Sequence, residues 1–119
     1  MPDVVFHRLD HSGVLRRLER YARDDLGRRP EVRQVVLIGS LARGDWSARS
    51  DADLVIVVDE AHQPARSRSE EYGPAGGIGV AVDLFVYTSE EAASWSPRFR
   101  SEVEGGMVLY RRSLPPGEG

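Results

Sequence analysis

A run of five apolar residues, from Leu54 to Val58, constrains the fold of this 119-residue chain more than any other feature. Because no polar residue alternates with the apolar ones, a strand formed here needs cover on both of its faces. Helices can provide that cover, so we expect an α/β or α+β domain built on a small mixed sheet. A chain of this length has room for one hydrophobic core and therefore for one domain.

The other strands and the first helix follow from local patterns. Apolar side chains recur at helical spacing over residues 14–26, and Gly27 and Pro30 end the pattern, so a helix is expected over about residues 12–27. Short apolar segments predict the remaining strands, at residues 34–38, 80–87 and 107–110.

Shorter helical segments are expected between the strands. Thr88 and Glu91 have the spacing of a capping box and predict a helix start. Pro97 interrupts that helix, and a second one is expected to reach about Glu104. Gly39 stops the first short strand, and residues 40–43 are expected to form a single helical turn after it.

The interior segment 60–79 is polar and rich in Arg, Ser, Pro and Gly. A short helix near residues 66–72 is expected within it, and the role of the segment is left open. The whole chain, residues 1–119, is expected to be one domain with its core at about residues 34–110. Residues 113–119 contain Pro and Gly and are expected to form a frayed tail.

Composition and charge exclude several classes of protein. The chain has no cysteine, so disulfides, zinc–thiolate sites and thiol nucleophiles are ruled out. Its formal net charge of -3 argues against a protein that coats nucleic acid, and no direct nucleic-acid binding is expected. No apolar run approaches the roughly 18 residues of a membrane span, and the acidic start lacks the apolar stretch of a signal peptide. We therefore expect a cytoplasmic protein without membrane contact.

Three aspartates lie close to the apolar strands. Asp51 and Asp53 are two residues apart, so on an extended backbone both carboxylates point to the same face. Asp83 interrupts the apolar strand expected at residues 80–87, where an unpaired charge is costly. A divalent cation shared by the three carboxylates would compensate this charge, because hard cations take oxygen ligands.

Taken singly, the aspartates also have structural interpretations. Asp51 could cap a turn, since a Ser-Asp pair is common in turns. Asp53 could form an ion pair with Arg43 or Arg49. Asp83 is harder to explain in this way, because carboxylates inside apolar strands are uncommon unless they are paired.

A glycine and a serine, Gly39 and Ser40, follow the first short strand. Backbone N–H groups at the end of a strand can bind a phosphate. Together with the three acids, this pair favours metal-assisted phosphoryl or nucleotidyl transfer.

The spacing of these residues resembles a known signature. Gly39-Ser40, ten intervening residues and Asp51-Ala52-Asp53 are similar to the GSx10DxD block of the minimal nucleotidyltransferases, which belong to the DNA polymerase β-like superfamily. Asp83 falls where that family carries its third acid. The resemblance covers about residues 34–110, and it implies the polymerase β-like nucleotidyltransferase fold.

The resemblance also implies a role for each residue. Asp51 and Asp53 would bind two Mg²⁺ ions, and Asp83 would bind one of them and help to activate the attacking hydroxyl. Gly39 and Ser40 would hold the β- and γ-phosphates of a nucleoside triphosphate. Arg43 would either contact the triphosphate or pair with an acidic neighbour, such as Asp53 or Asp45.

Stand-alone chains of this length resemble the antitoxin half of HEPN–MNT toxin–antitoxin pairs. That resemblance implies transfer of AMP from ATP to a tyrosine of a HEPN-domain ribonuclease, with the two proteins in a hetero-oligomer. Two alternatives stay open. The chain could be an antitoxin that acts by binding alone, or a transferase that acts on a small hydroxylated molecule.

Overall fold

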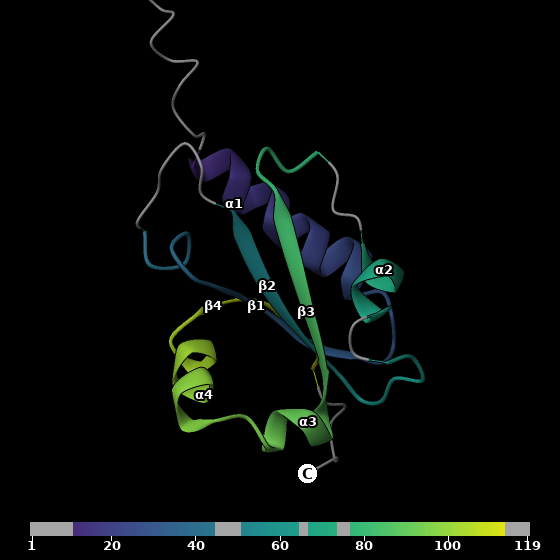
Figure 1. The fold of residues 1–119 in the computed structure, drawn as a ribbon. Coiled ribbons are helices and arrows are strands. Elements are labelled where there is room, and N and C mark those ends of the chain that lie inside the picture. Colours follow the sequence, from purple (N-terminus) through teal and green to yellow (C-terminus); the bar gives the residue numbers. More distant parts are fainter. Residues whose placement is uncertain (1–10, 45–50, 65–66, 74–76, 114–119) are drawn as a thin grey trace, which may run out of the picture.

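Four strands form one mixed sheet in the computed structural model, which describes residues 11–44, 51–64, 67–73 and 77–113 (Figure 1). The strand order is β3–β2–β1–β4, with β1 antiparallel to both β2 and β4, and β2 parallel to β3. This confirms the small mixed sheet expected from the sequence. The strands are β1 (Val32–Ile38), β2 (Ala52–Val58), β3 (Val82–Thr88) and β4 (Met107–Arg111).

The larger core lies on the face of the sheet that the N-terminal helical region covers. This region consists of α1 (His11–Arg20) and η2 (Tyr21–Leu26), which continues α1 with the wider π-helical winding. The expected helix is therefore confirmed, but not as one regular α-helix. The five-residue step from Tyr21 to Leu26 suits i→i+5 winding, and both side chains are buried.

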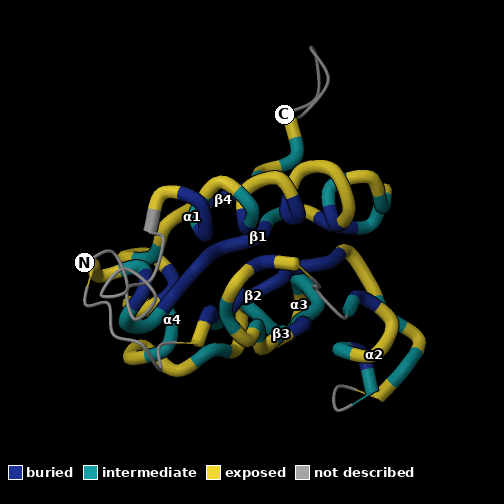
Figure 2. The backbone as a smooth tube through the Cα atoms, turned by 90° about the horizontal axis from the view of Figure 1, so that it is seen from above, coloured by how far each residue is buried: buried dark blue, intermediate teal, exposed yellow. Residues whose placement is uncertain are grey.

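The opposite face carries a smaller core beneath α3 (Ser89–Ala93) and α4 (Pro97–Glu104). Alternate residues of β2 contribute to the two cores, so this strand is buried on both faces, as its apolar run predicts (Figure 2). Cover on this side is incomplete: Phe85 and Val108 are 42% and 46% exposed, on the two edge strands. The smaller core consists of Val36, Ile38, Val55, Val57 and Val103, packed with Tyr87, Trp95 and Phe99.

The starts of α3 and α4 are set by side-chain caps. Thr88 and Glu91 form the expected capping box, with N–H···O distances of 3.1 and 2.9 Å. Ser96 accepts a hydrogen bond from the backbone N–H of Phe99, and Pro97 occupies the first turn of α4. None of the helices in the described ranges is long and apolar enough to cross a membrane.

The polar segment after β2 is anchored to the fold rather than separate from it. It contains the expected short helix, α2 (Arg68–Tyr72). The Arg68 guanidinium is buried and donates to the Glu91 carboxylate at 2.6 and 3.2 Å. The Tyr72 hydroxyl donates to Glu31, and burial together with this carboxylate raises the pKa of Tyr72. These contacts attach α2 to the α3 cap and to the residue before β1.

Candidate active site

The parallel pairing of β2 with β3 brings two of the predicted acids side by side. Asp53 is in register with Asp83, and side chains in register on parallel strands project to the same face. Adjacent strands are about 4.8 Å apart, so the two carboxylates are neighbours. Asp51 is exposed just before β2, and the intervening Ala52 is buried in the core on the α1 side. The acids therefore occupy one end of the opposite face, the face that α3 and α4 partly cover.

The position of Asp83 differs from the expectation. The strand begins at Val82, not at residue 80, so Asp83 is its second residue and is exposed. The argument that its charge is buried in an apolar strand was therefore wrong. The main chain of Ala81 still accepts a hydrogen bond from the Ala52 N–H at 2.8 Å, which holds the entry to β3 against β2. Register with Asp53, rather than burial, is what connects Asp83 to the site.

Asp53 is half-buried and lies near three other carboxylates. Burial raises the pKa of its carboxyl, and the neighbouring Asp83, Asp51 and Glu102 carboxylates raise it further. No ion pair to Asp53 occurs within the described part of the chain. A set of oxygen donors whose repulsion is uncompensated fits a hard divalent cation.

The acids are close enough to interact but do not surround a single point. Among residues 11–44, 51–64, 67–73 and 77–113, no three Asp, Glu or His side chains are gathered tightly enough to hold one metal ion. The assignment of Asp51, Asp53 and Asp83 as metal ligands stays a prediction.

Gly39 places the end of β1 directly against Asp53. Its φ of +84° is unfavourable for other residues, and a Cβ there would lie 2.9 Å from Asp53 Oδ2. The Arg43 N–H donates to the Gly39 carbonyl at 3.2 Å and closes the expected helical turn, in which Ser40 is half-buried. The phosphate-binding turn predicted from Gly39 and Ser40 thus adjoins the acids.

A cavity of about 420 Å³ separates this turn from α4. Such a volume lies in the range of small-ligand sites. Gly39 and Arg43 line one side of it, and Arg98, Ser101 and Glu102 line the other. The cavity therefore combines two arginines with the glycine turn, next to the acids.

Sequence reasoning missed the three α4 residues of this cavity. Arg98, Ser101 and Glu102 are three and four positions apart, which places them on one helix face. The Ser96-Pro97 helix start could have directed attention to this polar stripe. However, only packing of the buried Val103 against the sheet shows that the stripe faces Gly39.

Arg43 has a different partner from those expected. Its Nη1 lies 3.5 Å from Glu102 Oε2, and within the described ranges it forms no ion pair with Asp53. Arg43 therefore pairs with an acidic neighbour, as one of the two alternatives had it, but the partner is Glu102, because α4 brings this carboxylate to the turn. Asp45 and Arg49, the other partners considered, lie outside the described residues.

Gly106 keeps α4 close to this end of the sheet. A Cβ at this position would lie 2.6 Å from the Leu37 carbonyl oxygen and 2.7 Å from Val36 Cγ1. Only glycine allows β4 to start in contact with β1 directly after α4. The cavity between the Gly39 turn and α4 depends on this close approach.

A mixed sheet with two acids in register beside a glycine turn is the arrangement expected of a nucleotidyltransferase. The sequence profile of the nucleotidyltransferase domain matches residues 15–109, and the chain belongs to this family. Over 85 residues, which are 69% of this chain and 82% of the relative, it is 31% identical to a Methanocaldococcus jannaschii protein named "Putative protein adenylyltransferase MJ0604". The chain is thus a nucleotidyltransferase by family.

Solved structures share the fold at low sequence identity. A "putative nucleotidyltransferase" from Sulfolobus solfataricus superposes with a TM-score of 0.63 at 20% identity, covering 86% of this chain and 84% of its own. A toxin–antitoxin structure with AMP-PNP superposes with a TM-score of 0.55 at 19% identity, covering 82% and 73%. These matches confirm the nucleotidyltransferase fold expected from the sequence.

Proposed function

We propose that this protein is a cytoplasmic, Mg²⁺-dependent transferase that moves AMP from ATP to a hydroxyl of a partner protein. The partner would be a HEPN ribonuclease toxin, held with this antitoxin in a hetero-oligomer. One observation carries the proposal: Asp53 and Asp83 are in register on parallel strands, and Asp53 lies directly beside the Gly39 turn. Membership of the nucleotidyltransferase family supports this use of the acids.

The metal would be held by Asp51, Asp53 and Asp83. When bound, two Mg²⁺ ions would neutralise phosphate charge and position the attacking and leaving oxygens. The crowded carboxylates around Asp53 fit this role, because their mutual repulsion favours a cation.

The residues of the chain itself would bind and orient the triphosphate. Backbone N–H groups at Gly39 and Ser40 would donate to the β- and γ-phosphates, with Arg43 and Arg98 supplying positive charge across the cavity. Asp83 would accept the proton of the acceptor hydroxyl. The hydroxyl oxygen then forms a bond to the α-phosphorus, the bond to the bridging oxygen breaks, and pyrophosphate leaves.

The open surroundings of Asp83 favour a protein as acceptor. β3 is an edge strand, and a groove of about 840 Å³ borders Asp83, Phe85 and Glu70. An aromatic side chain exposed beside a free strand edge suits docking of another polypeptide. The relative from Methanocaldococcus is named a protein adenylyltransferase, and one structural neighbour is a toxin–antitoxin with an ATP analogue, which supports AMP as the transferred group.

The proposal is tested by incubating the protein with ATP labelled on the α-phosphate, Mg²⁺ and the HEPN-domain protein encoded beside it. Label is expected on the partner with the wild-type chain and to be lost with Asp51→Asn. Absence of label with the wild-type chain would overturn the transfer. A double Asp51→Asn, Asp53→Asn variant that still neutralises the toxin would show inhibition by binding alone. Label on a small hydroxylated molecule instead would favour the other alternative.

A further inference from the structure

Glu102 is held at the cavity by the packing of α4. Its neighbour Val103 is buried in the smaller core, and the Ser96 cap fixes the start of the helix. Glu102 lies on the cavity wall together with Arg98 and Ser101. It is therefore a carboxylate in a cavity that, under the proposed function, takes the triphosphate of a nucleotide.

The contact between Glu102 and Arg43 crosses this cavity. The closest oxygen and nitrogen are 3.5 Å apart, and the side chains are 43% and 62% exposed. Ion pairs this exposed are weak, so a stronger ligand of Arg43 can displace Glu102. A triphosphate that uses Arg43 has to replace this carboxylate.

Glu102 also shares this end of the sheet with the acids. Gly39, which lines the cavity opposite Glu102, directly adjoins the Asp53 carboxylate, so the cavity borders the proposed metal site. Among the described residues, a triphosphate without metal meets four carboxylates here and the two arginines of the cavity. A triphosphate complexed to Mg²⁺ carries less negative charge, and its cation attracts the same carboxylates. The four carboxylates are Asp51, Asp53, Asp83 and Glu102.

We propose that Glu102 is a selectivity residue. In the nucleotide-free protein it forms the ion pair with Arg43, and it makes the cavity accept Mg²⁺-bound triphosphate in preference to metal-free triphosphate. This inference rests on the proposed function only in placing the nucleotide in this cavity. It requires neither an acceptor nor transfer.

The experiment measures ATP binding by calorimetry to wild-type protein and two variants, once with Mg²⁺ and once with EDTA. Wild-type protein is expected to bind ATP more tightly with Mg²⁺. Glu102→Gln is expected to tighten binding in EDTA by roughly threefold to tenfold and to change binding in Mg²⁺ by less than about twofold, which lowers the selectivity. Glu104→Gln is the matched control, because Glu104 is an exposed acid of the same helix that lines a different cavity.

The outcomes separate this inference from the proposed function. If Glu102→Gln gives the same two affinities as Glu104→Gln, the inference is wrong even when the wild-type chain labels its partner. If Glu102→Gln loses selectivity while no partner is labelled, the inference stands and the proposed transfer does not. Equal wild-type affinities in Mg²⁺ and EDTA would overturn the inference, and a wild-type chain that binds no ATP would overturn both. Thermal melts confirm that the variants are folded.

Discussion

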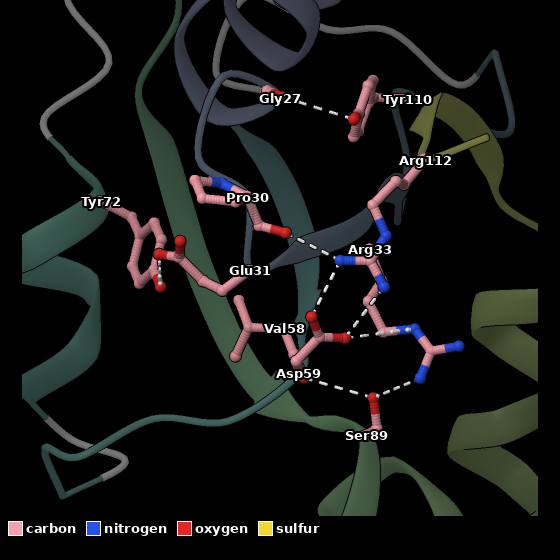
Figure 3. Close-up of polar contacts among 10 residues, drawn as sticks. All are labelled: Gly27, Pro30, Glu31, Arg33, Val58, Asp59, Tyr72, Ser89, Tyr110 and Arg112. Atoms are coloured by element: carbon pink, nitrogen blue, oxygen red, sulfur yellow. Dashed lines mark hydrogen bonds and ion pairs between the residues drawn. The ribbon is translucent and has the colours of Figure 1, made fainter. Parts of the chain in front are cut away.

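The two ends of β2 place the same residue type in opposite environments. Asp59, just past its end, receives hydrogen bonds from Arg112 at 2.8 and 3.0 Å and lies 3.7 Å from Arg33 (Figure 3). These guanidinium groups, Arg112 first, lower the pKa of the Asp59 carboxyl. At the start of the strand, burial and three other carboxylates raise the pKa of Asp53. Among the described residues, arginines pair with Asp59, whereas none forms an ion pair with Asp53.

The difference shows which end of the sheet serves stability and which is available for a ligand. Around Asp59, the arginines also donate to Ser89 and to the Pro30 carbonyl, so they connect β1, α3 and the residue after β4. In the part of the chain that the structure describes, the neighbours of Asp53 are acids and the glycine turn. Its uncompensated charge is a cost to the fold that bound metal would offset.

The largest expected difference between the two ends is catalytic. Asp53→Asn is expected to lower AMP transfer by at least about 100-fold, because a carboxylate at the reacting phosphates is lost. It should also abolish any rise in melting temperature caused by Mg²⁺. Asp59→Asn, the matched change at the other end of β2, should retain both AMP transfer and the rise in melting temperature with Mg²⁺. A Mg²⁺-dependent rise in melting temperature that persists in Asp53→Asn would contradict the assignment of Asp53 as a metal ligand.

The two variants are also expected to differ, by a smaller amount and in opposite directions, in the free energy of unfolding measured without metal. Asp59→Asn should lower the free energy of unfolding by about 1 kcal/mol or less, because its paired arginines are partly exposed. Asp53→Asn should leave this free energy unchanged or raise it, since it removes repulsion. Urea denaturation in EDTA measures both variants. Equal destabilisation by the two changes would remove the distinction between the ends.

The smallest effect is on the pH dependence of stability in EDTA. Because the pKa of Asp53 is raised in the folded state, its ionised form costs stability at neutral pH, and this cost is relieved as the pH falls through the raised pKa. The lowered pKa of Asp59 has the opposite consequence: its contribution is present above the ordinary value of 3.8 and is lost as the pH falls below it. Arg68 lowers the pKa of Glu91, so Glu91 adds to the loss of stability at low pH.

Thermal melts between neutral pH and about pH 3 separate these contributions. Wild-type stability is expected to rise slightly in mild acid before it falls. Asp53→Asn should lack the rise, and Asp59→Asn should show a weaker fall, with the Glu91 contribution remaining. A wild-type curve that falls steadily from neutral pH would contradict the assigned environment of Asp53.

Features that depend on neighbouring residues could be predicted from the sequence. The apolar run of β2 predicted a strand covered on both faces, and Thr88 with Glu91 predicted the α3 cap, because periodicity and capping act over a few residues. The interval from Gly39 to Asp53 indicated the nucleotidyltransferase family before any fold was known. In each case a local pattern contained the information.

The tertiary structure decided which distant groups meet. It placed Asp83 at the exposed start of β3 in register with Asp53, and it paired Arg43 with Glu102, 59 residues away. It also brought Arg112 to Asp59, 53 residues away. Such contacts depend on sheet register and on how α4 packs through Val103 and Gly106, and no local spacing encodes them. The sequence by itself thus determined the class of chemistry, whereas packing determined which charges oppose one another at the site.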